Sequence, residues 1–285
     1  MTTSKKIRFV TDSTCDIPEE LVARYRIGVV PSFVNYGGQS YADDGRELNR
    51  ETFYQQLPSI RPHPTTSAPS PGLAEQVIGQ VAEDADHIVV LTAPAALSAI
   101  HNTLRLGVES LGLQDRATLL DSGMVSMGLG YQVLAGALAA EETGDLQRVL
   151  EVVKSARERV RVYAGLATME YLRRSGRVNW AKASVGALLQ IKPVIGVLNG
   201  EVPQVALVRT FARALDKLAE LARAEAPLEQ LTILYTHNLE SAQAFKERLA
   251  DIAPPDTRIL GVTPVIGVHI GPDSLGVATL RRAAQ

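Results

Sequence analysis

Cysteine and aromatic residues are scarce in this sequence. Its 285 residues include one cysteine, Cys15, and aromatic residues make up only 5%. A single cysteine excludes an internal disulfide and fits a reducing compartment, so we expect a cytoplasmic protein in which Cys15 packs in the core. Apolar residues still reach 46%, so aliphatic side chains must build the interior. This composition is typical of layered α/β folds.

An excess of positive charge is also absent. The formal net charge is -2 at pH 7, and the pI is about 6.2. Proteins that neutralise the phosphates of nucleic acids carry a strongly basic surface. We therefore expect no nucleic acid as the main partner.

Long apolar segments are nearly absent as well. The apolar stretch near the N-terminus is too short for the core of a signal peptide. The uncharged segment 122–140 approaches the length of a membrane-spanning helix, but it contains Ser126, Tyr131 and Gln132. We expect a helix covered on both sides by protein, and not an integral membrane protein.

The common catalytic and metal-binding motifs are missing. The sequence has no GxSxG, P-loop, HExxH or CxxC pattern, and no Gly-x-Gly-x-x-Gly follows its first predicted strand. Its five histidines show no metal-ligand spacing. A Ser-His-Asp triad can be assembled from His269, Asp121 and one of several serines, but so free a choice carries little weight. We expect no metal and no cofactor.

Strands and helices alternate in the part of the chain that ends near Val160. Apolar runs predict strands at residues 7–10, 28–34, 87–92 and 117–121. Helices are predicted at 18–26, 49–57, 73–82, 97–111 and 124–141, with a Pro-rich loop at 58–71. This alternation indicates a parallel sheet with crossover helices.

The pattern changes after a charged amphipathic helix predicted at 145–160. Strands are predicted at residues 163–168, 191–198, 202–209, 231–236 and 257–264, but helices only at 211–224 and 239–253. More strands per helix favour an α+β domain with antiparallel pairing. We therefore expect two domains, residues 1–160 and 161–285.

Polar residues follow three strands of the predicted parallel sheet. The segment 12–14 reads Asp-Ser-Thr, Thr92 ends another strand, and Asp121 and Ser122 end a third. Parallel sheets bind ligands at the carboxyl ends of their strands, so the three ends together indicate one shared crevice. Taken singly, each is also an ordinary polar turn.

Two further segments contain candidate ligand-binding groups. The loop 64–71 places Thr65, Thr66 and Ser67 between prolines, which predicts either a rigid array of hydroxyl donors or a surface loop before a helix cap. The segment 172–177 contains three arginines beside a glycine. Such a turn suits a carboxylate or phosphate, and it is equally typical of a solvated basic surface.

Glycine marks two more segments. His269 lies between Gly267 and Gly271, where the backbone can approach a ligand closely, although a structural histidine is an equal alternative. Segment 121–130 is rich in small residues. They would let a long apolar molecule pass beside the helix, or let two helices pack closely.

In this order, these segments resemble the DegV family of bacterial fatty-acid-binding proteins. The resemblance rests on residues 10–18 (VTDSTCDIP), 30–31, 64–71, 121–130, 171–177, 191–193 (IKP) and 264–272. Each piece is short, and the ordered set over nearly the whole chain is specific.

The resemblance implies a Rossmann-like N-terminal domain and a second α/β domain with a mixed or antiparallel sheet, against which the loop 62–72 packs. It implies a long-chain fatty acid between the domains, handed in some bacteria to a fatty-acid kinase. The carboxylate would meet Thr66 and Ser67, with His269 in the same network. Arg173 or Arg177 of the basic turn would lie close by.

This chain departs from the family pattern near the head group. Pro94 and Ala95 stand where the family has two serines, and Ala68 and Asp273 also differ from the usual Gln and Gly. One head-group hydroxyl is therefore lost. Thr92 would replace it if its loop shifts, and Ser122 is the other hydroxyl expected at this edge.

Three functions remain open from the sequence. The leading interpretation is a lipid carrier that binds a fatty acid and is not an enzyme. An enzyme acting on an acyl or phosphorylated small molecule in the same crevice would need a paired base and nucleophile. A regulatory protein in which the lipid only stabilises the fold is the third.

Overall fold

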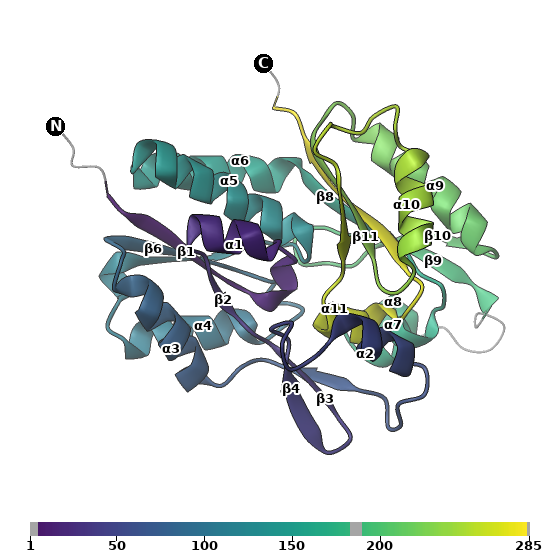
Figure 1. Cartoon of the computed structure of the whole chain (residues 1–285), viewed down its shortest axis with the longest axis horizontal. Coiled ribbons are helices and arrows are strands. Elements are labelled where there is room, and N and C mark those ends of the chain that lie inside the picture. The colour runs from purple at the N-terminus through teal and green to yellow at the C-terminus, as the bar shows by residue number, and fades with distance from the viewer. Residues whose placement is uncertain (1–4, 183–189, 284–285) are drawn as a thin grey trace.

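The computed structural model of the chain describes residues 5–182 and 190–283. Its strands form a four-stranded parallel sheet, a three-stranded antiparallel sheet and a six-stranded mixed sheet. Figure 1 shows the parallel and the mixed sheet side by side, with the three-stranded sheet below them. The predicted α/β class, with a parallel and a mixed sheet, is confirmed.

The parallel sheet has the strand order β2-β1-β6-β7. Its strands are β1 (Ile7–Asp12), β2 (Gly28–Val30), β6 (His87–Thr92) and β7 (Ala117–Asp121). Successive side chains of a strand face opposite sides of the sheet. Phe9 and Val89 pack toward helices α5 (Met127–Thr143) and α6 (Leu146–Arg159), whereas Val10 and Val90 pack toward α3 (Pro71–Ala82) and α4 (Ile100–Ser110). Burial on both faces explains why these strands read as nearly continuous apolar runs.

Helices cover both faces of this sheet. The helices that precede β8 are α1 (Glu19–Tyr25), α2 (Arg50–Gln56), α3 (Pro71–Ala82), α4 (Ile100–Ser110), α5 (Met127–Thr143) and α6 (Leu146–Arg159), with short 3-10 turns η1 (Ser13–Cys15) and η2 (Gln114–Arg116). Asn49 and Ser70 cap α2 and α3 with their side-chain oxygens, because the first amides of a helix lack partners within it.

The three-stranded sheet corrects two predictions. Its strands are β3 (Phe33–Tyr36), β4 (Gln39–Ala42) and β5 (Thr65–Ser67), in the order β4-β3-β5. The single strand predicted at 28–34 is wrong: Pro31 has no N–H to give to a ladder, and the chain leaves the parallel sheet after Val30. The predicted loop at 58–71 contains β5, which pairs with β3.

The mixed sheet has the order β10-β9-β8-β13-β11-β12. Its strands are β8 (Val160–Gly165), β9 (Lys192–Val197), β10 (Gln204–Val208), β11 (Leu228–Tyr235), β12 (Arg258–Gly261) and β13 (Leu275–Arg281), and helices α9 (Phe211–Ala224) and α10 (Leu239–Glu247) cover its outer face. The sequence analysis missed β13. It is a central, almost wholly buried strand that pairs with β8 and β11, and its pairing partners lie far away in the sequence.

Helix α5 lies between the two large sheets. It contacts β1 of the parallel sheet and β8 and β13 of the mixed sheet, which confirms the prediction of a helix covered on both sides. A Cβ on Gly128 would lie 2.5 Å from Val162, and one on Gly136 would lie 2.4 Å from Phe9. The small residues of α5 therefore let strands of both sheets approach it closely, a role that neither of the two alternatives named. Within residues 5–182 and 190–283, no helix is both long and apolar enough to cross a membrane.

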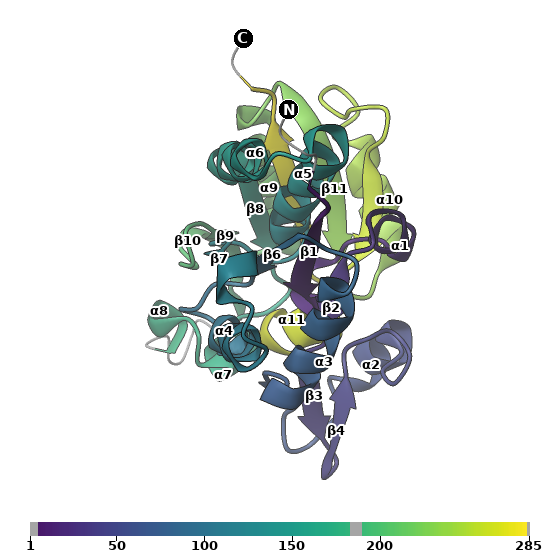
Figure 2. The ribbon, with the colours of Figure 1, turned by 90° about the vertical axis from the view of Figure 1, so that its left-hand side faces the viewer.

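A short helix follows the last parallel strand of the mixed sheet. The strand predicted at 257–264 is wrong at its end, because β12 stops at Gly261 and α11 (Pro264–Ile270) begins with a proline in its first turn. Helix α11 packs against α7 (Glu170–Ser175), α2, β3 and β5, and α8 (Asn179–Lys182) follows α7. Figure 2 shows α11 in the middle of the molecule, above β3.

Candidate functional site

Strand β5 and helix α11 bring together two predicted site residues. Thr66 pairs with Val34 of β3, and His269 lies in the last turn of α11. The hydroxyl oxygen of Thr66 lies 3.0 Å from Nε2 of His269. Two residues far apart in the sequence thus form one polar contact between the three-stranded sheet and the C-terminal part of the chain.

The glycines around His269 have a packing role. A Cβ on Gly267 would lie 2.2 Å from the hydroxyl of Tyr54, and one on Gly271 would lie 2.3 Å from the ring of Tyr171. Gly271 also has a φ of 80°, a conformation that other residues rarely adopt. The two glycines of the Gly-x-His-x-Gly segment therefore let α11 pack closely against Tyr54 and Tyr171.

Arg177 joins this pair. Its Nη2 lies 3.4 Å from the Thr66 hydroxyl, to which it donates, and its Nη1 donates to the carbonyl of Ser175 at 2.8 Å. Gly176, with a φ of 71°, ends α7 and turns the chain so that Arg177 faces β5. Thr66, His269 and Arg177 form what we call the head-group triad.

His269 is a neutral imidazole in this setting. Burial lowers its pKa to about 3, and the positive charges of Arg177 and His63 act in the same direction. Among the described residues, its Nδ1 atom has no hydrogen-bond partner. A neutral imidazole has one N–H donor and one acceptor nitrogen.

The triad leaves one donor hydrogen without an acceptor in either tautomer. If Nε2 carries the hydrogen, it donates to Thr66, and the Thr66 hydroxyl is free to donate elsewhere. If Nδ1 carries it, Thr66 donates to Nε2, and the Nδ1–H has no acceptor among the described groups. A carboxylate, which only accepts hydrogen bonds, satisfies either arrangement beside the cationic Arg177.

Two of the predicted residues lie near the triad without joining it. The side chains of a strand alternate, so Ser67 points away from the face of Thr66, and its hydroxyl accepts from the Asn35 amide at 3.2 Å. Arg173 is exposed on α7, and within the described ranges its side chain makes no hydrogen bond or ion pair. The geometry gives neither residue a contact with Thr66 or His269.

Thr92 and Ser122 are buried and already satisfied. The Thr92 hydroxyl donates to the carbonyl of Ala93 at 3.0 Å and lies 2.9 Å from Nδ1 of His101. The Ser122 hydroxyl donates to the carbonyl of Met124 at 2.9 Å and accepts from its amide at 3.1 Å. Both hydroxyls close local turns, so their predicted contact with a ligand needs a rearrangement of those turns.

Two aspartates hold the loop that carries Pro94 and Ala95. Asp12 accepts from the amide of Ala93 at 2.7 Å, and Asp121 accepts from the amide of Ala95 at 3.0 Å. The polar strand ends do lie along one edge of the parallel sheet. Their carboxylates bind backbone amides of the loop.

Several polar residues that the sequence analysis missed tie α11 to the first half of the chain. Asp16 accepts from the amide of Thr263 at 2.9 Å, and Asp43 accepts from its hydroxyl. Tyr54 donates to the carbonyl of Val262 at 3.0 Å, and Nε2 of His63 lies 3.1 Å from the carbonyl of Val268. Asp16 stood in a motif that the resemblance used. The other three have no recognisable pattern, because their partners lie in the opposite half of the sequence.

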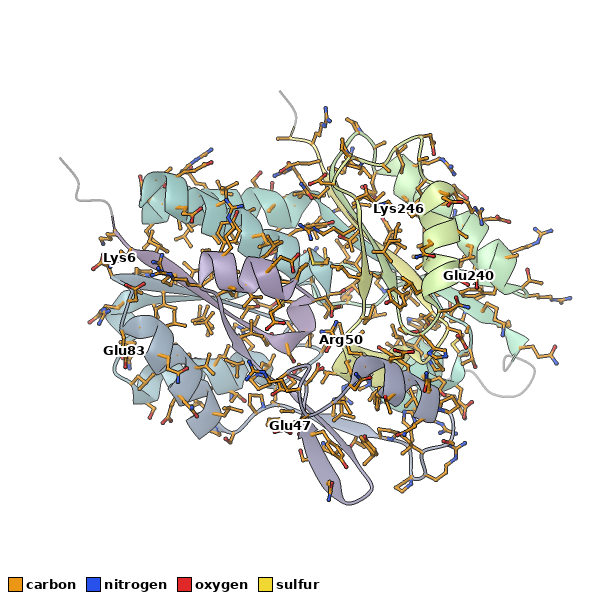
Figure 3. The ribbon with its side chains drawn as sticks, viewed as in Figure 1. Lys6, Glu47, Arg50, Glu83, Glu240 and Lys246 are labelled. Carbon is orange, nitrogen blue, oxygen red and sulfur yellow. The ribbon has the colours of Figure 1, made fainter. Side chains whose placement is uncertain are left out.

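A cavity of about 950 Å³ lies beside this interface. Its lining includes Asp16, Asp43 and Arg50 from the first half of the chain and His237 and Gly261 from the second. Figure 3 shows Arg50 near the centre of the molecule, where its Nη1 donates to the carbonyl of Gly261 at 2.6 Å. Thr66 and His269 do not line this cavity.

A metal centre has no support within residues 5–182 and 190–283. No group of three or more His, Cys, Asp or Glu side chains there is arranged to hold a metal ion.

Comparison with known proteins identifies the family. A family model described as "Uncharacterised protein, DegV family COG1307" matches residues 6–282. The chain belongs to the DegV family. A DegV domain-containing protein of Streptomyces coelicolor is 32% identical over 284 residues, covering 98% of this chain and 100% of the relative. One of Deinococcus radiodurans is 34% identical over 280 residues, covering 95% and 97%.

Solved structures of DegV proteins have the same fold. One, described as "Fatty Acid Binding of a DegV family Protein from Thermus thermophilus", superposes with a TM-score of 0.88 at 30% identity, covering 97% of this chain and all of that one. Another, described as DegV, a fatty acid binding protein from Bacillus subtilis, has a TM-score of 0.84 at 23% identity, covering 98% of this chain and 100% of that one. The second comparison shows the fold alone.

Proposed function

We propose that this protein binds one long-chain fatty acid, holds its carboxylate at the head-group triad and presents it to a partner enzyme such as a fatty-acid kinase. The unpaired donor of the Thr66–His269 contact carries the proposal, because it is available to an acceptor such as a carboxylate oxygen. The Thermus thermophilus relative, described as a fatty-acid-binding DegV protein, supports the ligand class.

The electrostatics of the triad favour an anion. Arg177 supplies a permanent positive charge, and the lowered pKa of His269 reflects both burial and nearby positive charge. A neutral His269 can donate one hydrogen bond and adds no second charge. A carboxylate that replaces water here gains a charge-assisted hydrogen bond.

The hydrocarbon chain would run from His269 along the apolar side of α11. Ile266 and Ile270 lie four residues apart on α11 and pack against the apolar cluster formed by α5 and the mixed sheet. A buried methylene contributes about 0.8 kcal/mol. A tail of about fourteen methylenes therefore contributes on the order of 10 kcal/mol before ordering costs. One hydrogen bond contributes about 1 kcal/mol, so the tail dominates affinity and the triad sets orientation.

The Thr66–His269 pair resembles a nucleophile and a base, but two features argue against catalysis. In a hydrolytic triad a carboxylate accepts from the second ring nitrogen, whereas Nδ1 of His269 has no partner among the described residues. A general base works best with a pKa near the working pH, and that of His269 is lowered to about 3. We infer a carrier and not an enzyme.

Presentation to a kinase is the further part of the proposal. Arg177 of the triad and Arg173 nearby on α7 are exposed, on a surface that a partner enzyme can reach. Phosphorylation of the carboxylate requires an oxygen held close to the position of in-line attack. The triad would hold the oxygen there.

Native mass spectrometry of the purified protein tests the proposal. We expect one fatty acid per chain, released on unfolding and identified in the extract. A chain that retains no lipid and takes up no fatty acid after delipidation would overturn the carrier function. Hydrolysis of an acyl ester by the pure protein, lost in His269→Ala, would support the enzyme instead.

A further inference from the structure

We propose that Asp16 and Asp43 are positioning residues for the head-group triad: they hold the start of α11 and thereby place His269 against Thr66. The inference rests on the proposed function only where it concerns the ligand. The arrangement of α11 can be tested without one.

Both carboxylates act on the residue that precedes α11. Asp16 follows β1 and η1, and its Oδ1 accepts from the Thr263 amide at 2.9 Å. Its Oδ2 accepts from the Ser126 hydroxyl at 2.6 Å. Asp43, just after β4, accepts from the hydroxyls of Thr263 and Ser13. The donor residue Thr263 is fully buried.

Helix α11 connects Thr263, which Asp16 and Asp43 hold, directly to His269. It spans seven residues, and its first turn closes with a hydrogen bond from the amide of Gly267 to the carbonyl of Thr263 at 3.0 Å. An α-helix rises about 1.5 Å per residue, so Thr263 and His269 are about 9 Å apart on one rigid element. Displacement of Thr263 therefore displaces His269.

The three-stranded sheet contacts both ends of this helix. Asp43 follows β4 and Thr66 lies in β5, and these strands flank β3. One small sheet thus reaches Thr263 at the start of α11 and His269 at its end. Together with the contacts of Tyr54 and His63 to Val262 and Val268, the Thr263 contacts therefore set the distance between His269 and Thr66.

The carboxylates of Asp16 and Asp43 are buried, although both line the cavity. Burial disfavours their charged forms. Burial raises the pKa of both to about 6. Arg50 of α2 opposes the shift from 3.6 Å away from Asp16, while the two carboxylates repel one another. Tyr54 of α2, Cys15 of η1 and Asp12 of β1 are the other titratable groups of this cluster.

The sign of the charge effect follows from linkage. A carboxyl group whose pKa is raised in the folded state favours that state most below its ordinary value near 4, and this contribution is lost as the pH rises through about 6. At neutral pH Asp16 and Asp43 therefore hold Thr263 through their hydrogen bonds, despite the charges on the two carboxylates. A neutral amide in place of Asp43 keeps the acceptor oxygen and removes the desolvation cost.

Three variants separate the loss of the acceptor oxygen at Asp43 from the loss of its negative charge. Asp43→Ala removes the acceptor, Asp43→Asn keeps it, and Glu51→Gln neutralises an exposed carboxylate that lines the same cavity. We would titrate the His269 ring by NMR without ligand. The wild type, Asp43→Asn and Glu51→Gln should keep the depressed pKa of His269. In Asp43→Ala its pKa should rise toward the ordinary value of about 6.5, because the ring gains water.

A further pair of variants tests the same contact from the side of Thr263, in case Asp43→Ala does not fold. Thr263→Val removes the hydroxyl that donates to Asp43, and Thr263→Ser retains it. Thr263→Val should shift the His269 titration as Asp43→Ala does, and Thr263→Ser should not. An unchanged His269 titration in folded Asp43→Ala or Thr263→Val would overturn the positioning role.

Binding of palmitate gives the second readout. In the wild-type and Asp43→Asn backgrounds, Thr66→Val should weaken binding about fivefold, the equivalent of one hydrogen bond. In the Asp43→Ala background Thr66→Val should cost nothing further, since residues that act as a unit are not additive. Equal costs in all backgrounds would overturn the inference. A wild type that binds no palmitate would instead count against the proposed function and leave the NMR result to judge the positioning role.

Discussion

At the scale of single residues, hydroxyl groups that look alike in the sequence make different contacts in the structure. Thr66 meets His269 and Arg177, whereas Thr92 and Ser122 close local turns and Ser67 pairs with Asn35. The ordered motifs predicted Thr66, His269 and Arg177. They could not separate them from the others, because a short polar motif does not say whether a neighbouring amide or carbonyl satisfies the side chain.

Thr66→Val should weaken fatty-acid binding about fivefold, because it removes about 1 kcal/mol of hydrogen bonding and leaves the tail untouched. Coupled phosphorylation by a kinase should fall further, since orientation is lost. Thr65→Val is the matched control, because alternation places Thr65 on the opposite, exposed face of β5. Calorimetric titration of the two variants with the same fatty acid gives the comparison. Equal affinities would mean that Thr66 is only a strand residue and takes no part in binding.

At the scale of elements, the strands and helices with local signals were predicted, and those defined by distant partners were not. The apolar runs of β1, β6 and β7 and the amphipathic α9 needed only their own residues. Strand β13 and the three-stranded sheet depend on pairing with segments far along the chain. Helix α11 was missed because the strand predicted at 257–264 ran into its first residue, and a short segment with Gly267 and Gly271 shows no helical pattern of its own. Packing against Tyr54 and Tyr171 favours the helix there.

Gly267→Ala should destabilise the protein strongly, because the added methyl would lie 2.2 Å from the hydroxyl of Tyr54 in the buried face of α11. We expect a loss of about 2–3 kcal/mol in the free energy of unfolding, typical of overpacking. Gly72→Ala is the control: it lies in α3 with no atom within 4 Å of its Cβ position. It should be neutral or stabilising by up to about 1 kcal/mol. Urea denaturation that ranks the two variants the other way would contradict the packing argument.

At the scale of the whole molecule, three sheets meet around α5 and α11, and polar contacts join segments from the two halves of the sequence. The mixed sheet begins with β8 at Val160 and includes every described strand after it. The division into domains 1–160 and 161–285 stays a prediction, because the three-stranded sheet contacts α11 closely. We therefore expect the stability of the protein to depend on pH through the titratable side chains buried where these segments meet.

The pH dependence of stability should reveal His269. Its pKa is depressed in the folded state, so its contribution is present above the ordinary value of about 6.5 and is lost as the pH falls toward 3. Asp16 and Asp43 act oppositely below pH 6, because their pKa values are raised. His269→Gln should therefore be relatively more stable than the wild type at pH 5 than at pH 8, by on the order of 1 kcal/mol. Parallel pH profiles of the urea midpoint for the two proteins would show that His269 is not held neutral.

The central claim is that a fatty-acid carboxylate lies at Thr66 and His269, and NMR of bound palmitate labelled with ¹³C at its carboxyl carbon tests it most directly. We predict one bound carboxyl resonance at a ratio of one per chain. It should shift in Thr66→Val and in His269→Gln, but not in Thr65→Val. No bound resonance, or one that the Thr66 and His269 substitutions leave unchanged, would contradict the account.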